Sequence, residues 1–451
     1  MSQDPGVRPA AVAGAFYPGD ARQLAAELGE LLDGVENLEP RLGYPKALIV
    51  PHAGYIYSGP VAARAYDELA AARGLVRRVV LLGPAHYVGG RGLALPAADA
   101  FETPLGRIAL DRDGIEALAG LRQVVRSAPA HAQEHSLEVQ LPFLQRALGE
   151  FTLVPLAVGA ATREEVEQVL ERLWGGPETL IVISTDLSHY HEYRQAKRID
   201  GATLLRIAGF ATDLSHDEAC GATPLNGFLG LAKRKGLRIR LLGACNSGDT
   251  AGGKGRVVGY SSFALHGEDA VSPEEAGRTL VALARDTILD ALGRKPKSPA
   301  PQPGWLRMRG ATFVTLTRAG SLRGCIGSLE IGRPLGEDVA HNALAAAFRD
   351  PRFPALTREE WPDCALEVSV LSTPKPVRFA DEADLLAQLK PGEDGVILEH
   401  EGRRATYLPQ VWEALPDKRL FLSELLRKAG LPADTRLARC RVQRYRVRKF
   451  A

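Results

Sequence analysis

Short, continuous apolar runs alternate with amphipathic stretches along the chain as far as His266. Residues 21–33 carry leucines at helical spacing, which predicts an amphipathic helix. The apolar runs predict buried strands within residues 46–55, 77–87, 151–158, 179–186, 237–245 and 257–265. Helical patterns separate most of them, at residues 61–74, 136–148, 163–174, 192–208 and 223–235. This alternation predicts an α/β fold with a mostly parallel sheet covered by helices on both faces.

The pattern changes after His266. Residues 273–292 predict one more helix, and the proline-rich stretch 293–304 predicts an extended loop. Beyond residue 305, strand-like stretches mix with two expected helices, which is typical of an α+β domain. We place the boundary before the helix, because that helix needs a core to pack on. The expected domains are residues 1–268 and 269–451.

Four polar residues lie at, or just beyond, the carboxyl ends of the predicted strands: His52, His86, Asp186 and Cys245. In open α/β sheets this edge is where ligands bind. Two imidazoles and a thiolate favour iron, zinc or copper, so His52, His86 and Cys245 are the candidate metal ligands. The competing interpretation is structural: a lone histidine after a strand often caps or fills a core, and Cys245 alone is a small buried hydrophobe.

Further candidates surround this set. Asp186 and His189 are three residues apart, so one helical turn would bring both to one pocket as supporting groups, an acid/base pair or extra metal ligands. Asp186 would otherwise cap the following helix. His135 and Glu138 begin a predicted helix off its leucine stripe and therefore face the loop edge. We expect His135, Asp186 and His189 to serve in catalysis.

Composition narrows the protein class. Of 451 residues, 45% are hydrophobic and 24% charged, and 56 basic against 54 acidic side chains leave a net charge of +2. Such a balance gives no field to attract nucleic acid or an acidic membrane surface. Five cysteines without CxxC spacing argue against a disulfide framework and a zinc ribbon. Neither a secretory signal nor a long apolar stretch is visible, so we expect a cytoplasmic protein without a membrane span.

Six motifs in order resemble the Memo family over residues 8–266: RPAAVAGAFYPGD, VPHAGYIYSG, GPAHY, EHSLEVQLPFL, STDLSHY and GACNSGD. That family is similar in fold to class III extradiol dioxygenases, whose iron is held by two histidines and a glutamate. The resemblance implies His52, His86 and Cys245 as metal ligands, Asp186 and His189 as neighbours, and His135 as a pocket histidine. A cysteine is softer than a carboxylate and is itself oxidisable, so ring cleavage does not carry over directly.

Residues 272–450 resemble the AMME-chromosomal-region family through SLRGCIGSLE, AFRDPRFPAL, LEVSVLSTPKPV and GVILEHEGRRATYLPQVWEAL. The RGCIG segment combines a thiol and a cation with two glycines that allow close approach of the backbone or a positive φ. Its candidate crevice residues are Arg323, Gly324, Cys325 and Gly327. Cys325 is either a nucleophile or, as we favour without a histidine partner, a buried cysteine in a strand connection. FRDPRF predicts a turn held by charged side chains. The basic stretch 436–450 predicts a charged edge strand rather than a nucleic-acid surface.

The two domains in one chain resemble the AmmeMemoRadiSam proteins, which implies a separately encoded radical SAM enzyme as partner; this chain has no CxxxCxxC cluster. We expect a metal-dependent, dioxygenase-like oxidoreductase that uses Fe(II), with Cu or Zn as the other candidate metals, on a small organic substrate. Two alternatives stay open. One is a non-catalytic iron- or copper-binding scaffold, and the other is a hydrolase in which the metal activates water.

Overall fold

The computed structural model describes residues 6–267, 271–293 and 303–451. The chain forms two compact units: residues 1–35 with 44–270, and residues 36–43 with 271–451. The expected boundary at 268/269 lies outside the described residues, as does most of the expected proline-rich loop. No helix among the described residues is long and apolar enough to cross a membrane.

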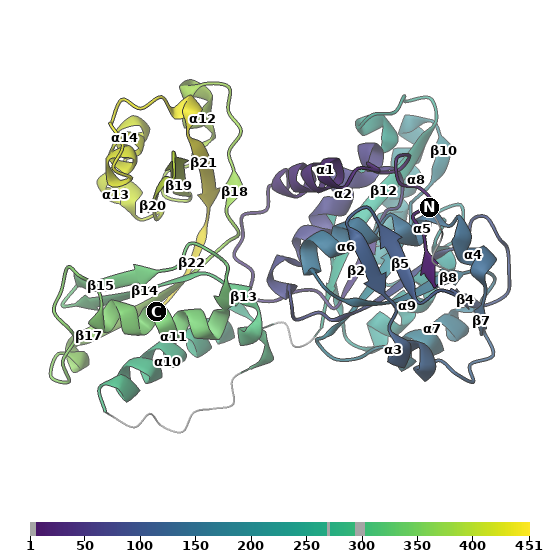
Figure 1. The fold of residues 1–451 in the computed structure, drawn as a ribbon, viewed down its shortest axis with the longest axis horizontal. Coiled ribbons are helices and arrows are strands. Elements are labelled where there is room, and N and C mark those ends of the chain that lie inside the picture. Colours follow the sequence, from purple (N-terminus) through teal and green to yellow (C-terminus); the bar gives the residue numbers. More distant parts are fainter. Residues whose placement is uncertain (1–5, 268–270, 294–302) are drawn as a thin grey trace. The chain divides into compact units, whose positions relative to one another are not determined.

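The first unit is built on a nine-stranded sheet (Figure 1). Four neighbouring strands at its centre run parallel: β2 (Ala47–Val50), β9 (Thr179–Ser184), β3 (Arg78–Pro84) and β8 (Thr152–Val158). On one flank, β12 (Val257–His266) runs antiparallel to β2 and also pairs antiparallel with β11 (Arg238–Asn246) and β10 (His189–His191). On the other flank, β4 (Leu93–Leu95) runs antiparallel to β8 and parallel to β7 (Val124–Arg126). The predicted α/β class is confirmed, with parallel pairs at the centre of the sheet and between β4 and β7 at one edge.

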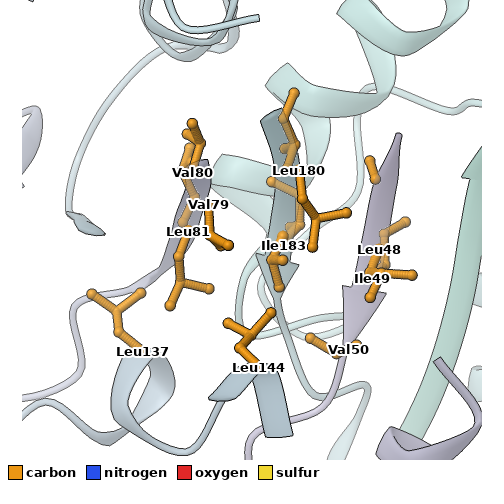
Figure 2. Packing of buried hydrophobic residues seen from close by; sticks show 14 of the residues in the cluster. Leu48, Ile49, Val50, Val79, Val80, Leu81, Leu137, Leu144, Leu180 and Ile183 are labelled. Atoms are coloured by element: carbon orange, nitrogen blue, oxygen red, sulfur yellow. The ribbon is translucent and has the colours of Figure 1, made fainter. Parts of the chain in front are cut away.

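Every residue of β2 and β9 is buried, so both faces of the sheet are covered. Leu137 and Leu144 pack against the central strands (Figure 2). The unit's helices are α1 (Ala21–Asp33), α2 (Tyr55–Asp67), α3 (Arg112–Ala117), α4 (Ala128–Ala132), α5 (His135–Glu138), α6 (Leu141–Leu148), α7 (Arg163–Arg172), α8 (Tyr193–Ala208) and α9 (Ala222–Arg234). A small sheet adds β1 (Val7–Arg8), β5 (Ala100–Thr103) and β6 (Gly106–Ala109).

The helix ends follow local chemistry. Asp20 caps α1 by accepting hydrogen bonds from two backbone N–H groups, and its leucines Leu24 and Leu28 are buried. Thr162 and Glu165 form a reciprocal capping box at the start of α7. These local signals explain why α1 covers the predicted residues 21–33 and why α7 begins at the predicted residue 163.

The second unit contains two four-stranded sheets. One has the order β15 (Ser321–Gly327), β14 (Thr312–Arg318), β17 (Cys364–Leu371), β22 (Val447–Phe450) and packs against α10 (Pro273–Ala291) and α11 (Leu335–Phe348). The other has the order β18 (Lys375–Pro376), β21 (Arg441–Tyr445), β19 (Gly395–His400), β20 (Arg403–Tyr407). Its companions are α12 (Glu382–Gln388), α13 (Val411–Ala414) and α14 (Lys418–Lys428), and a short pair joins β13 (Arg309–Gly310) to β16 (Arg333–Pro334).

Two expectations for this unit need correction. Beyond residue 305 the described chain forms four α-helices rather than two, because α12 and α13 are too short to show a periodic pattern. The basic C-terminal stretch forms two strands, not one edge strand. β22 is at an edge of its sheet, but β21 lies between β18 and β19, where Val442 and Tyr445 are buried.

Candidate functional site

His52 follows β2 and is buried, and a chain of hydrogen bonds defines its protonation. Its Nδ1 lies 2.8 Å from Ser184 Oγ. The Ser184 hydroxyl donates to the Ser136 carbonyl at 2.6 Å and accepts from Gln140 Nε2 at 2.9 Å. Since its proton is already used, Ser184 accepts from His52 Nδ1–H. The Nε2 atom of His52 therefore keeps its lone pair for a ligand.

His86 follows β3 and is oriented by Glu134, a residue that the sequence patterns did not single out. Glu134 Oε1 lies 2.9 Å from His86 Nδ1, and Oε2 accepts the His86 backbone N–H at 2.6 Å. Burial alone would raise the pKa of Glu134, but the hydrogen bonds and charge of His86 lower it to about 2. The ionised carboxylate holds the proton on Nδ1, so Nε2 of His86 is also free to bind.

Cys220 completes the group. It precedes α9, and its Sγ lies 3.3 Å from His52 Nε2 and accepts the Asp186 backbone N–H, also at 3.3 Å. The ligand atoms of His52, His86 and Cys220 all lie within 4.8 Å of one another. Burial, followed by the charge of Asp186, raises the pKa of the Cys220 thiol to about 12. A bound cation would reverse this shift by favouring the thiolate.

Cys245, the cysteine expected here from the sequence, is not part of this group among the described residues. It lies in β11, which pairs with β12, so β12 separates it from β2. Neighbouring strands are about 4.8 Å apart, which puts β11 roughly 10 Å from β2. A signal for Cys220 was present: it lies three residues before the predicted helix 223–235, and a helix N-terminus favours a thiolate.

Asp186 and His189 lie beside the group, although not through the expected helical turn, because His189 begins the strand β10. Asp186 Oδ1 accepts the His52 backbone N–H at 2.7 Å, and Oδ2 lies 3.9 Å from His52 Nε2. Burial raises the pKa of Asp186 to about 7, against the effect of that hydrogen bond. His189 Nδ1 lies 2.8 Å from the Leu187 carbonyl and therefore carries the proton, which leaves its Nε2 free. Burial also lowers the pKa of His189.

His135 joins the same cluster through its ring, which stacks on His86 at 4.7 Å between centroids and meets His52 edge-on at 5.4 Å. Burial and the charge of His86 lower its pKa to about 4. The buried Nδ1 of His135 has no hydrogen-bond partner among the described residues. Its ligand atom also falls within 4.8 Å of those of His86 and Glu134.

Glu138, which the sequence placed at the pocket edge, has a structural role instead. It is fully buried and forms an ion pair with Arg8. Its carboxylate also accepts the Tyr17 hydroxyl at 2.6 Å and the Ala11 backbone N–H at 2.8 Å. Glu138 therefore anchors the N-terminal segment. The site itself presents four imidazoles with free or unpaired nitrogens, a set that suits a cation.

In the second unit the RGCIG segment lies in β15. A Cβ on Gly324 would lie 2.1 Å from the Ala346 carbonyl of α11, and one on Gly327 would lie 2.2 Å from the Phe313 ring. Both positions therefore require glycine for close packing. The Arg323 guanidinium pairs with Glu360 at 3.0 Å and donates to the Pro354 carbonyl at 2.9 Å.

Cys325 is held by the FRDPRF turn, which is stabilised by charged side chains as predicted. Its backbone N–H donates to Asp350 Oδ2 at 2.9 Å, and its carbonyl accepts from Arg352 Nη2 at 3.2 Å. Arg352 also pairs with Asp350 at 2.7 Å. The thiol accepts a hydrogen bond from Thr315 Oγ1 at 3.3 Å. The cation fixed beside Cys325 is thus Arg352, while Arg323 is bound to Glu360.

Known proteins match both parts of the chain. The family described as Memo-like protein matches residues 8–264, more than half of the 451 residues, and AMMECR1 matches residues 281–450. A MEMO1 family protein of Aquifex aeolicus is 37% identical over 270 residues, covering 56% of this chain and 97% of that protein. One of Pyrobaculum arsenaticum is 36% identical over 284 residues, covering 58% and 99%.

Among solved structures, that of an uncharacterized protein from Pyrococcus horikoshii is 35% identical and covers 38% of this chain and 89% of its own, with a TM-score of 0.36. The Memo-like match, over residues 8–264, includes the strand-end histidines, Glu134 and Cys220. This chain therefore belongs to the Memo family and carries an AMMECR1 domain after its Memo-like part.

Proposed function

We propose that the Memo-like unit binds a transition metal through His52 Nε2, His86 Nε2 and Cys220 Sγ. The observation that carries this proposal is the convergence of three ligand atoms, two of which are imidazole nitrogens whose protons are held on the opposite side of the ring. Typical metal–nitrogen and metal–sulfur bond lengths of roughly 2.0–2.3 Å imply ligand atoms roughly 3–3.5 Å apart. The 3.3 Å between Cys220 Sγ and His52 Nε2 fits that spacing.

Fe(II) is the metal we propose first, with copper or zinc as alternatives. Two imidazoles and one anionic ligand on one side of a metal are typical of non-haem iron oxygenases, and the thiolate also suits copper and zinc. When bound, such an iron would supply redox chemistry on a small organic substrate. We propose an oxidoreductase, and a radical SAM enzyme as its partner remains part of this proposal.

The surrounding side chains would handle protons. His189 offers an unprotonated Nε2 beside His52 and His86, which is the position of an acid/base group. Asp186 orients the His52 backbone through its 2.7 Å hydrogen bond. His135, stacked on His86, would position the ring and exclude water. None of these roles needs a residue outside the cluster.

Metal analysis of the full chain, purified without oxygen, tests the proposal. We expect near-stoichiometric iron in the wild type and its loss in His52→Ala/His86→Ala. His191→Ala serves as the control, because His191 lies on β10 outside the group of ligand atoms. Absence of bound metal, together with no uptake of Fe(II), Cu(I) or Zn(II), would overturn the proposal. Zinc binding with oxygen-independent turnover would point to the hydrolase instead.

A further inference from the structure

A second cluster of reactive and charged side chains lies in the AMMECR1 unit. Cys325 of β15 pairs with Thr315 of β14, and Thr315 pairs with Glu367 of β17. Residues directly opposite across strands share one face of a sheet, so these three side chains lie in a row. All three are partly exposed, whereas Gly324, the next residue of β15, packs on α11. The thiol therefore lies on the face of the sheet opposite α11.

Arg352 is held in place next to this thiol. Its Nε and Nη2 both donate to Asp350, at 2.9 Å and 2.7 Å, and its Cζ lies 5.6 Å from the centre of the Phe353 ring. Its Nη1 has no hydrogen-bond partner among the described residues, and about half of the side chain is exposed (53%). Two of the three nitrogens thus fix the guanidinium, and the third is available to a ligand.

Lys428, at the end of α14, contributes a second cation. Its Nζ donates to the Thr406 carbonyl at 2.9 Å and lies 4.8 Å from the centre of the Tyr407 ring. Burial and the charge of Arg352 lower the pKa of Lys428, while the charge of Cys325 raises it. These groups are therefore within electrostatic range of one another. Lys428 makes no ion pair within the described chain, so its charge is not neutralised by an acid.

The local charge favours an anion. Asp350 balances Arg352, Glu360 balances Arg323, and Glu367 pairs with Lys449 at 3.8 Å. Lys428 then remains as the surplus positive charge within electrostatic range of the thiol. The buried Arg323 also keeps an Nη1 without a partner among the described residues.

We propose that Cys325, Arg352 and Lys428 form a binding site for a small anionic molecule. A carboxylate or phosphate would rest on Arg352 Nη1 and Lys428 Nζ, with Cys325 Sγ next to the bound molecule. Arginine and lysine are the side chains that bind such oxyanions most strongly. This site lies in the AMMECR1 unit and does not depend on the metal proposal.

Thiol–disulfide exchange on the full chain tests this site. The probes are dithiobis(nitrobenzoate), which is an anion, and dithiodipyridine, which is uncharged. In each reaction the Cys325 thiol loses its proton to solvent, and the thiolate attacks one probe sulfur to form a protein–probe disulfide. The other half of dithiobis(nitrobenzoate) leaves as a thiolate. The other half of dithiodipyridine leaves as a thiolate that takes a proton from solvent to become pyridinethione. Peptide mapping and Cys325→Ser identify the signal of Cys325 among the five cysteines.

The quantity to compare is the rate of Cys325 with the anionic probe divided by its rate with the uncharged probe. We expect this ratio to fall about three- to tenfold in Lys428→Gln, because the variant loses one positive charge near contact range. Arg427→Gln is the matched control, because Arg427 is the neighbouring exposed cation of α14 and pairs with Glu424. Inorganic phosphate should slow the reaction of Cys325 with uncharged dithiodipyridine in the wild type but not in Lys428→Gln. An unchanged ratio in a folded Lys428→Gln, or equal falls in both variants, would overturn the proposal.

Discussion

Cys220 Sγ lies 3.3 Å from His52 Nε2, although 168 residues separate them in the chain. The contact exists because β2 ends at the same edge of the sheet where α9 begins. It makes Cys220, rather than Cys245, the thiol beside the two strand-end histidines. Comparing metal binding after replacement of Cys220 and of Cys245 is therefore the sharpest test of the site.

Replacing Cys220 with serine should reduce iron affinity by at least tenfold, because a hydroxyl is a much poorer ligand than a thiolate for this metal class. Cys245→Ser is the matched control and should retain the wild-type affinity, since β12 separates β11 from β2. Competition with a chelator of known affinity would measure both. Loss of metal in Cys245→Ser alone would contradict the arrangement seen here.

Ser184→Ala should weaken both stability and metal binding. The change removes the acceptor of His52 Nδ1–H and Gln140 Nε2 and the donor to the Ser136 carbonyl, all of them buried. We expect a loss of about 1–3 kcal/mol in the free energy of unfolding and a 10- to 100-fold lower metal affinity. Ser262→Ala is the control, because its buried hydroxyl has no partner among the described residues. Equal stability and equal metal affinity of the two variants would refute the conclusion that Ser184 holds the proton on His52 Nδ1.

Stability should fall as the pH drops from about 6.5 to about 4, in part through His131. This histidine is buried with Nε2 2.7 Å from the Ala94 carbonyl. Burial lowers its pKa to about 4, despite that hydrogen bond. In this window the unfolded chain binds the proton and the folded chain does not, so protonation favours unfolding by up to about 3 kcal/mol.

His131→Gln removes this titration while keeping a donor for Ala94. Urea denaturation at several pH values should therefore show a shallower acid dependence in the variant than in the wild type. His216→Gln, at an exposed histidine, is the comparison. Identical slopes for His131→Gln and the wild type would show that His131 titrates normally in the fold.

Glu138→Gln should destabilise the first unit while leaving metal binding intact. Breaking a buried ion pair typically costs about 3–5 kcal/mol, since it leaves an uncompensated charge, here on Arg8. Thermal unfolding would measure the loss, and metal titration below the unfolding transition would measure binding. Glu164→Gln, at an exposed glutamate, is the control and should change neither the thermal stability nor the metal binding. A stable variant that no longer binds metal would instead place Glu138 in the site.

The sequence by itself determined most of the elements of the first unit and much of the site. Helical leucine spacing and cap residues are local, so α1 covers the predicted residues 21–33. Apolar runs mark strands, and parallel neighbours share an edge, so His52, His86 and Asp186 were predicted together, along with Cys245, which the structure places elsewhere. Burial of both faces follows from the same uninterrupted runs.

Only the tertiary structure decided which cysteine joins the histidines and how each ring is held. Strand order sets the distance between β11 and β2, and no local pattern encodes it. Glu134 and Ser184 gave no sequence signal, because a polar residue at the edge of an apolar run resembles a cap until its partner is known. Their roles depend on hydrogen bonds to residues that lie far away in the chain, which are defined only once the sheet and helices have packed.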